Sequence, residues 1–316
     1  MTTAVVFAYS EVGERCLDAL LRHGVDVRLV FSHDDDPAES RWFPSVADAA
    51  RAAGLAVVTP ADPNTADWIE RVARLAPDFL FSFYYRHLLS DALLRTARRG
   101  ALNMHGSLLP KYRGRAPVNW ALVHGEQETG ASLHYMQSRP DAGPLVGQER
   151  CPIDINDTAL DVSHKVAAAA ERLLTRCLPH LIAGTAAATP LDLARGSYFG
   201  RRRPQDGLID WHRPALEIHN LVRAVAPPFP GAFGPWGRRT LRVLGSLYRA
   251  EPARFADAAP CLYVENGQLY LDGVDGRRIA ITAAQCDGAT LTPDSFAQCR
   301  GSGPVKVPEQ TQGVDS

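Results

Sequence analysis

Two polar side chains near the middle of the chain, Asn103 and His105, are separated by a single residue. If this segment is the end of a strand, both side chains point to the same face. Open α/β sheets build their ligand crevice at the carboxyl ends of their strands, so an amide and an imidazole there could meet a ligand together. Taken alone, the same spacing also fits a satisfied core histidine beside a turn asparagine.

A third candidate, Asp141, lies in an expected turn between a strand-like segment at 131–136 and the apolar pair Leu145-Val146. Aspartate is common in ordinary turns, so this position by itself indicates no function.

Three short motifs, in this order along the chain, resemble the folate-dependent formyltransferase family. They are Asn103-Met104-His105, Ser107-Leu108-Leu109-Pro110 and Asp141-Ala142-Gly143. Longer segments are similar to bacterial members of this family that act on UDP-4-amino-4-deoxy-L-arabinose, an amino sugar of lipid A modification. These segments, which span most of the first 235 residues, are 5–9, 81–86, 105–117, 198–211 and 219–226. The C-terminal part of the chain matches loosely.

The resemblance implies transfer of a formyl group from 10-formyltetrahydrofolate to the 4-amino group of a UDP-linked amino sugar. In that reaction Asn103 and His105 would donate hydrogen bonds to the oxyanion, and Asp141 would accept the proton of the amine. Relatives of this kind are often fused to a C-terminal decarboxylating dehydrogenase. This chain ends at Ser316, so we expect a stand-alone formyltransferase.

The same resemblance implies a site for the folate carrier. The pterin is expected against the backbone of His87-Leu88-Leu89, and the site is completed by Arg115 and the turn Gln137-Ser138-Arg139-Pro140-Asp141. Two positions depart from the family, which usually has alanine in place of Pro140 and a basic residue in place of Ser138. These departures affect the loop that is expected to contact folate.

Three consecutive arginines, Arg201-Arg202-Arg203, precede Pro204. Their planar heads with several donors suit a diphosphate, so we assign them to the UDP group of the substrate. The same run also fits a solvated basic connector.

The first half of the chain alternates strand and helix patterns, which predicts a Rossmann-like, doubly wound parallel sheet. We expect strands at 4–8, 25–31, 55–58 and 79–83, and helices at 46–53, 65–75 and 157–178, the last ended by Pro179. The first turn lacks the G-x-G-x-x-G fingerprint of dinucleotide sites, so nothing indicates a dehydrogenase.

After a helical pattern at 217–225, short apolar runs separated by turn signals predict a small β-barrel-like, OB-like domain. Asn266-Gly267 and Asp275-Gly276 are typical of hairpin turns. The predicted organisation is a catalytic domain at 1–188, a linker at 189–207, the β domain at 208–300 and a disordered tail at 301–316.

The composition fits an ordinary globular protein, with 46% hydrophobic and 22% charged residues and a formal net charge of -1. The six cysteines are dispersed, without zinc-like spacing, so we expect reduced thiols, no metal and a cytoplasmic location. No apolar stretch is long enough to predict membrane insertion.

The Asn/His/Asp centre is also shared by methionyl-tRNA formyltransferase, a competing interpretation of the chain. That relative must bind an acidic polynucleotide and carries a basic insertion after its second strand, whereas residues 33–41 here are acidic. Residues 201–300 contain 13 Arg and no Lys against 10 Asp or Glu, a small excess, so we expect no nucleic-acid partner.

Two more interpretations fit the residue pattern. The first is an N-formyltransferase that acts on another nucleotide-linked amino sugar, since such enzymes share the same centre. The second is a non-catalytic folate- or nucleotide-binding module. A protein that kept the fold but lost its activity would be expected to lose its polar catalytic residues first. The presence of Asn103, His105 and Asp141 therefore argues against a non-catalytic module.

Overall fold

The computed structural model describes residues 1–35, 41–255, 259–301 and 303–307. The chain forms two compact units, each of which draws on separate stretches of the sequence. The first comprises Met1–Pro117, Glu128–Pro152 and Ser163–Gly200, and the second comprises Val118–Gln127, Ile153–Val162 and Arg201–Ser316. Residues 118–127 and 153–162 therefore belong to the second unit, although they lie inside the range predicted for the catalytic domain. Within the predicted tail, residues 302 and 308–316 lie outside the described residues.

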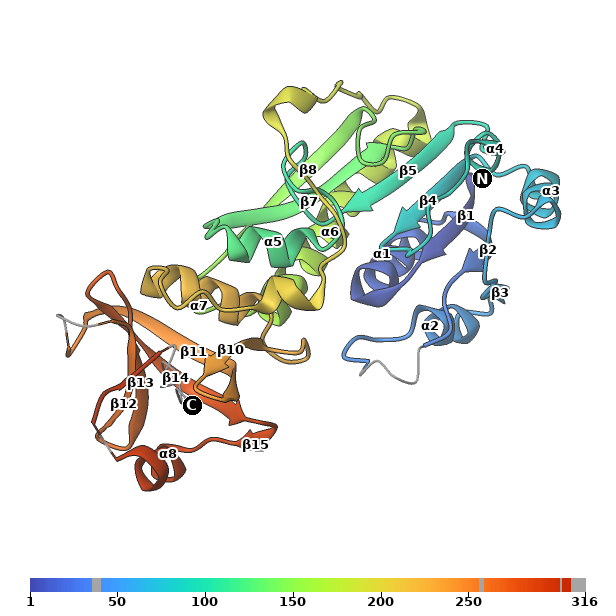
Figure 1. Ribbon diagram of the computed structural model, residues 1–316. Helices are drawn as coiled ribbons and strands as arrows, with labels where there is room; N and C mark the ends of the chain where they lie inside the picture. The colour runs from blue at the N-terminus through green and yellow to red at the C-terminus, as the bar shows by residue number, and fades with distance from the viewer. Residues whose placement is uncertain (36–40, 256–258, 302, 308–316) are drawn as a thin grey trace. The chain divides into compact units, whose positions relative to one another are not determined.

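The first unit is built on a seven-stranded sheet with the order β3-β2-β1-β4-β5-β7-β8 (Figure 1). Its strands are β1 (Thr3–Ala8), β2 (Asp26–Phe31), β3 (Val57–Val58), β4 (Phe79–Phe83), β5 (Gly100–His105), β7 (Glu128–Tyr135) and β8 (Leu145–Pro152). The first five strands are parallel, which confirms the prediction. Strand β7 is antiparallel to β5. Strand β8 is in turn antiparallel to β7, because the connection between these two strands is too short for a helical crossover.

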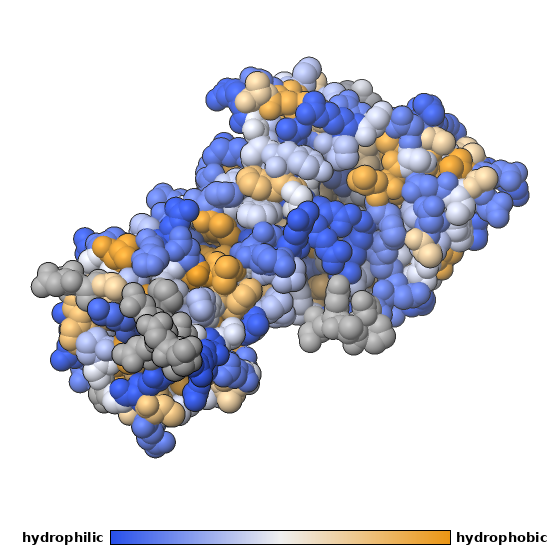
Figure 2. Space-filling view, viewed as in Figure 1, coloured by the Kyte–Doolittle hydropathy of each residue, from blue (hydrophilic) through white to orange (hydrophobic). Residues whose placement is uncertain are grey.

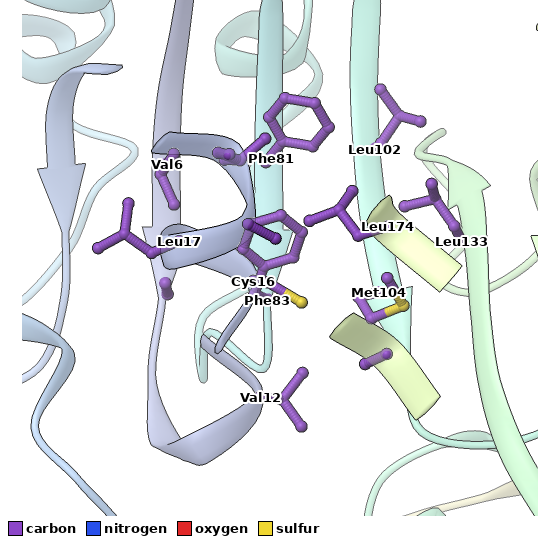
Figure 3. Close-up of a cluster of buried hydrophobic side chains, with 14 of the residues drawn as sticks. Val6, Val12, Cys16, Leu17, Phe81, Phe83, Leu102, Met104, Leu133 and Leu174 are labelled. Carbon is purple, nitrogen blue, oxygen red and sulfur yellow. The ribbon is translucent and has the colours of Figure 1, made fainter. Parts of the chain in front are cut away.

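Helices cover both faces of this sheet. They are α1 (Ser10–Arg22), α2 (Val46–Ala52), α3 (Ala66–Leu75), α4 (Asp91–Leu94) and α6 (Ala159–Ala183). On one face, Phe81, Leu102 and Leu133 from neighbouring strands pack against Leu17 of α1 and Leu174 of α6 (Figure 3). On the other face, alternate strand residues pack against α3 and α4. Because the central strands are buried on both faces, they are continuous apolar runs.

Helix α6 is longer than predicted. We expected Pro179 to end it, but the helix continues to Ala183. A proline inside a helix removes one backbone hydrogen bond, and here the last turn has other support. Leu181 is buried in the core, and the guanidinium of Arg99 donates hydrogen bonds to the carbonyls of Leu181 and Ile182. Tertiary contacts therefore outweigh the local signal.

The second unit contains a curled antiparallel sheet with the order β10-β11-β14-β13-β12-β16, and β15 pairs with β14 (Figure 1). Its elements are α5 (Pro117–Val123), α7 (Ala215–Ala224), β10 (Ala232–Trp236), β11 (Arg239–Pro252), β12 (Cys261–Glu265), β13 (Gln268–Asp272), β14 (Arg277–Cys286), β15 (Ala289–Thr290), α8 (Pro293–Arg300) and β16 (Val305–Lys306). The prediction of a Rossmann-like sheet with a second, β-barrel-like domain is confirmed. Asn266 and Gly267 both have a positive φ, as the hairpin signal predicts.

The segment predicted as a linker contains short elements of its own. These are two 3₁₀ turns, at Leu193–Arg195 and Pro204–Gly207, and strand β9 (Tyr198–Phe199). Strand β9 pairs in parallel with the two-residue strand β6 (Arg113–Gly114). The linker is therefore part of the folded first unit up to Gly200.

All six cysteines are free thiols, as expected. Among the described residues, no helix has the length and apolar character needed to cross a bilayer. The face in Figure 2 is mostly hydrophilic, and its apolar residues form separate small patches.

A buried histidine in the second unit predicts a pH dependence of stability. His219 of α7 is fully buried, where Ser246 Oγ and the carbonyl of Ile155 satisfy both ring nitrogens. Burial lowers its pKa to about 4, the hydrogen bond to Ile155 opposes this, and the nearby Arg223 lowers it further. His219 therefore folds neutral, and its contribution to stability, up to about 3 kcal/mol, is present above about pH 6.5 and is lost as the pH falls towards 4.

The urea concentration at the unfolding midpoint should fall as the pH is lowered from about 7 to 4.5. We expect this fall to be smaller in His219→Gln, which keeps hydrogen-bonding capacity but cannot titrate. Urea unfolding at several pH values measures this slope, with His180→Gln on an exposed position as the matched control. Equal slopes for the wild type and His219→Gln would contradict the prediction.

Candidate active site

The predicted pair Asn103 and His105 lies at the carboxyl end of β5, as the spacing implied. Strand β5 has the parallel strand β4 on one side and the antiparallel strand β7 on the other. This register places Asn103 directly opposite His134, and directly opposite residues share a face of the sheet. At the end of β5, side chains of β5 and of its neighbour β7 therefore lie side by side on one face of the sheet.

The ring of His105 is held at Nε2, and its other nitrogen, Nδ1, faces Asp141. Its Nε2 lies 2.7 Å from the carbonyl oxygen of Tyr112, and its Nδ1 lies 3.5 Å from Oδ1 of Asp141. A carbonyl oxygen only accepts, so Nε2 carries a hydrogen and donates it. Nδ1 is then the nitrogen that faces Asp141 and that can exchange a proton with a ligand.

Asp141 lies in the loop between β7 and β8, with a left-handed backbone (φ 50) that aspartate tolerates better than most residues. Its Oδ2 accepts a hydrogen bond of 2.9 Å from the backbone amide of Gly114. Burial would raise the pKa of this carboxyl group, but electrostatic interaction with His105, contact with His134 and the hydrogen bond from the Gly114 amide outweigh it and hold the pKa well below its usual range. Asp141 is therefore a carboxylate at neutral pH.

His134 is a member of this cluster that our sequence reasoning missed. Its Nε2 lies 3.2 Å from Nδ2 of Asn103 and 3.5 Å from Oδ1 of Asp141, and its side chain is 2% exposed. Asn103 Nδ2 also lies 3.4 Å from Asp141 Oδ1. The signal that could have found His134 is the alternation of β7, in which Glu128, Ser132 and His134 lie on one face while Ala131 and Leu133 lie on the other.

We expect His134→Ala to lower kcat by roughly tenfold, because Asn103 then loses the partner that orients its amide. The dissociation constant for 5-formyltetrahydrofolate should stay within about twofold, since His134 acts on Asn103 rather than on the carrier. Steady-state kinetics and ligand titration measure both quantities. A weaker carrier affinity at unchanged kcat would contradict this role.

The turn at 137–141, predicted to hold the folate carrier, contacts α4, the helix that follows the predicted 87–89 segment. Ser138 Oγ donates a hydrogen bond of 3.1 Å to Asp91, which follows the 87–89 segment closely. Leu88 is 69% exposed, and its carbonyl accepts a hydrogen bond of 3.0 Å from Asn64 Nδ2. An exposed apolar side chain beside ordered backbone suits a flat pterin ring, so these residues fit the carrier.

The remaining residues predicted for the carrier are placed as follows. His87, Arg115, Gln137, Arg139 and Pro140 are exposed or half-buried. Leu89 packs against the core face that includes Leu93. Arg115 directly follows Gly114, so an exposed cation lies next along the chain to the amide that binds Asp141.

The three arginines predicted to bind the diphosphate belong to the second unit. Arg202 lies over the ring of Trp120, with 4.7 Å from its Cζ to the ring centroid, and its Nη2 donates to the carbonyl of Asp206. Burial lowers the pKa of Arg202. Arg201 and Arg203 are exposed, so within this run they are the better candidates for binding an anion.

The cluster combines the groups that acyl transfer to an amine requires. Asn103 supplies an amide donor, His105 supplies an imidazole with one nitrogen open, and Asp141 supplies a fixed negative charge beside it. In the part of the chain that the structure describes, no group of three or more histidine, cysteine or acidic side chains has an arrangement that could hold a metal ion.

Comparison with known proteins identifies the family. Residues 2–178 match the formyl transferase family, and residues 202–300 match the formyl transferase C-terminal domain. Among solved structures, the chain is similar to an N-formyltransferase from Helicobacter canadensis in complex with folinic acid and dTDP-3-aminofucose. That similarity has a TM-score of 0.72 at 21% identity, and it covers 89% of this chain and 99% of the other.

Two further structures share the fold. WlaRD, a sugar 3N-formyltransferase solved with dTDP and 5-N-formyl-THF, matches with a TM-score of 0.69 at 20% identity, over 89% of this chain and 97% of its own. HypX from Aquifex aeolicus matches with a TM-score of 0.62 at 16% identity, over 100% of this chain and 50% of its own. With both of its parts matched by the family, the chain belongs to the formyl transferases and is a folate-dependent N-formyltransferase.

Proposed function

We propose that this enzyme transfers the formyl group of 10-formyltetrahydrofolate to the 4-amino group of UDP-4-amino-4-deoxy-L-arabinose, in the cytoplasm and as a step of lipid A modification. The observation that carries the proposal is the convergence of Asn103, His105 and Asp141 at the end of β5. The sugar is supported by the resemblance of segments such as 105–117 and 198–211 to enzymes for this substrate. Solved relatives with folate and nucleotide-linked sugars support the same substrate class.

The formyl carbon comes from 10-formyltetrahydrofolate, which the loops at 87–89 and 137–141, together with Arg115, are proposed to hold. Asn103 Nδ2 donates a hydrogen bond to the formyl oxygen as negative charge develops on it. The contact of 3.4 Å from this nitrogen to Asp141 is long, so a ligand oxygen can replace it at small cost.

We propose a different proton acceptor from the one expected from the sequence. A carboxylate whose pKa is held well below its usual range, as that of Asp141 is, binds a proton weakly. Nδ1 of His105 faces this carboxylate and is the open ring nitrogen. We therefore assign the proton of the amine to His105 Nδ1, and to Asp141 the charge that stabilises the resulting imidazolium. As the bond from the formyl carbon to N10 of the carrier breaks, the imidazolium returns this proton to N10, so tetrahydrofolate leaves and His105 is neutral again.

The proposal also assigns the diphosphate to Arg201 and Arg203. We expect the double variant Arg201→Ala/Arg203→Ala to raise KM for the nucleotide sugar at least about tenfold, with KM for the folate donor unchanged. Arg195→Ala, an exposed arginine of the preceding 3₁₀ turn, is the matched control. An unchanged KM in the double variant would remove these two residues from the substrate site.

The decisive test offers the purified enzyme 10-formyltetrahydrofolate and one acceptor at a time, and follows the formylated product by mass. The acceptors are UDP-4-amino-4-deoxy-L-arabinose, a dTDP-linked 3-amino hexose, a UDP-linked amino hexose and methionyl-tRNA. We expect rapid formylation of the arabinose derivative alone. Preferred formylation of another acceptor would overturn the substrate assignment and leave the catalytic centre standing.

A further inference from the structure

One short loop supplies backbone groups to two of the proposed catalytic side chains. The carbonyl of Tyr112 accepts the hydrogen bond of 2.7 Å from His105 Nε2, and the amide of Gly114 donates the bond of 2.9 Å to Asp141 Oδ2. The loop at 110–115 therefore orients both the ring and the carboxylate. A displacement of this loop would move both side chains together.

The conformation of this loop depends on outside support. Tyr112 and Gly114 both have a left-handed backbone, with φ values of 56 and 94, and such conformations persist in non-glycine residues where the surroundings hold them. Strand β6, the regular element within the loop, is two residues long. Its backbone pairing is with β9, outside the loop, so the loop is held by a segment distant in the sequence.

The support comes from residues 196–199, which lie more than 80 positions further along the chain in the predicted linker. Ser197 makes three hydrogen bonds to the loop. Its amide donates to the carbonyl of Pro110 (3.2 Å), its Oγ accepts from the amide of Tyr112 (2.9 Å), and its carbonyl accepts from the amide of Arg113 (3.0 Å).

Phe199 completes the pairing. Its carbonyl accepts a hydrogen bond of 2.9 Å from the amide of Arg115. Its ring stacks on that of Tyr112, with 5.5 Å between centroids and 17° between planes. Together with Ser197, it contacts the loop on both sides of Gly114.

We propose that Ser197 and Phe199 are positioning residues of the formyl transfer reaction. They hold the loop at 110–115 so that the Tyr112 carbonyl and the Gly114 amide keep His105 and Asp141 in their reactive orientation. This inference rests on the catalytic roles proposed above for those two side chains. It extends the active site to a segment that lies outside the proposed contacts with substrate and carrier.

Gly196 offers a selective way to disturb the pairing. A Cβ at this position would lie 2.3 Å from the backbone oxygen of Pro110. The φ of Gly196 is −107, which any residue adopts, so the effect of Gly196→Ala is confined to that collision. Gly200 is the matched control, because a Cβ there meets no atom within 4 Å.

The test compares Ser197→Ala, Ser197→Thr, Gly196→Ala and Gly200→Ala, with kcat expressed per site that binds 5-formyltetrahydrofolate, so that unfolded protein does not count. We expect Ser197→Ala to lower kcat roughly three- to tenfold, and Ser197→Thr, which keeps the Oγ acceptor, to restore it. Gly196→Ala should lower kcat more than about tenfold, since displacement of reacting groups is costly. KM for both substrates should stay within about twofold in every variant.

Hydrogen exchange of the peptide covering 110–116 in the free enzyme gives a second readout that needs no acceptor. We expect faster exchange in Ser197→Ala and Gly196→Ala than in Gly200→Ala. Unchanged exchange would show that residues 196–199 do not hold the loop, and faster exchange with unchanged kcat would show that the loop does not position the reaction. Either result overturns the proposal.

Failure of the proposed catalytic centre is recognised separately. Wild-type turnover in His105→Ala or Asp141→Asn would remove the roles that the loop is proposed to support, and the positioning proposal with them. Loss of turnover in those two variants, together with full turnover in Ser197→Ala and Gly196→Ala, would remove the positioning role alone. The acceptor in all assays is the nucleotide sugar that the wild type formylates fastest in the panel above.

Discussion

His105→Ala is expected to lower kcat by roughly 10²–10⁴-fold, because the variant loses the group that we propose takes the proton of the amine. The imidazole is held by the Tyr112 carbonyl on one side and faces the ionised Asp141 on the other. Added imidazole should restore part of the rate. Steady-state and single-turnover kinetics measure the loss, and His124→Ala, on an exposed position, is the control.

The variant should remain folded. His105 is buried, and its removal leaves the Tyr112 carbonyl without this partner, which costs on the order of 1–3 kcal/mol. Circular dichroism and binding of 5-formyltetrahydrofolate separate a loss of chemistry from a loss of structure. Asp141→Asn, which keeps the shape of the side chain but removes its charge, should also lower kcat. Turnover close to the wild type in His105→Ala would refute its role as proton acceptor.

Asn103→Ala carries the second large expected effect, a fall in kcat of roughly 10²–10³-fold, the loss typical for removal of one oxyanion donor. The amide of Asn103 is oriented by His134 and lies near Asp141, so its donor is aimed before the reaction begins. KM for the nucleotide sugar should change little, since the interaction strengthens as charge develops on the formyl oxygen.

Comparison with His134→Ala makes this prediction specific. His134→Ala keeps the amide of Asn103 but removes the side chain that orients it. Its kcat should therefore fall less than that of Asn103→Ala. A rank order in which His134→Ala is the slower enzyme would contradict an oxyanion role for Asn103. It would indicate instead that the histidine acts on the reacting atoms.

Local patterns were sufficient to predict many of the elements. The apolar runs at 4–8 and 79–83 correspond to β1 and β4, and the helical pattern at 65–75 corresponds to α3. Asn266-Gly267 forms the predicted hairpin turn between β12 and β13. These features depend on residues that are neighbours along the chain, where periodicity and backbone preference act directly.

Local signals failed where distant residues decide. Pro179 has the residue type of a helix end, but α6 continues because Arg99 binds the carbonyls of its last turn. The orientation of β7 against β5 and the pairing of β9 with β6 have no signature within either segment. The division into two units also has no local signature, because residues 118–127 and 153–162 belong to the second unit although the first unit surrounds them in the sequence.

For the site, residue types and motif order sufficed to nominate Asn103, His105 and Asp141 and the formyltransferase family. The tertiary structure placed His134 beside them, made Nδ1 the open nitrogen of His105, and held the carboxyl of Asp141 ionised through contacts from β5, β6 and β7. The reason is physical, because a side chain carries its chemistry in its own atoms. Its tautomer, its charge and its orientation are set by whichever groups the fold brings within a few ångströms.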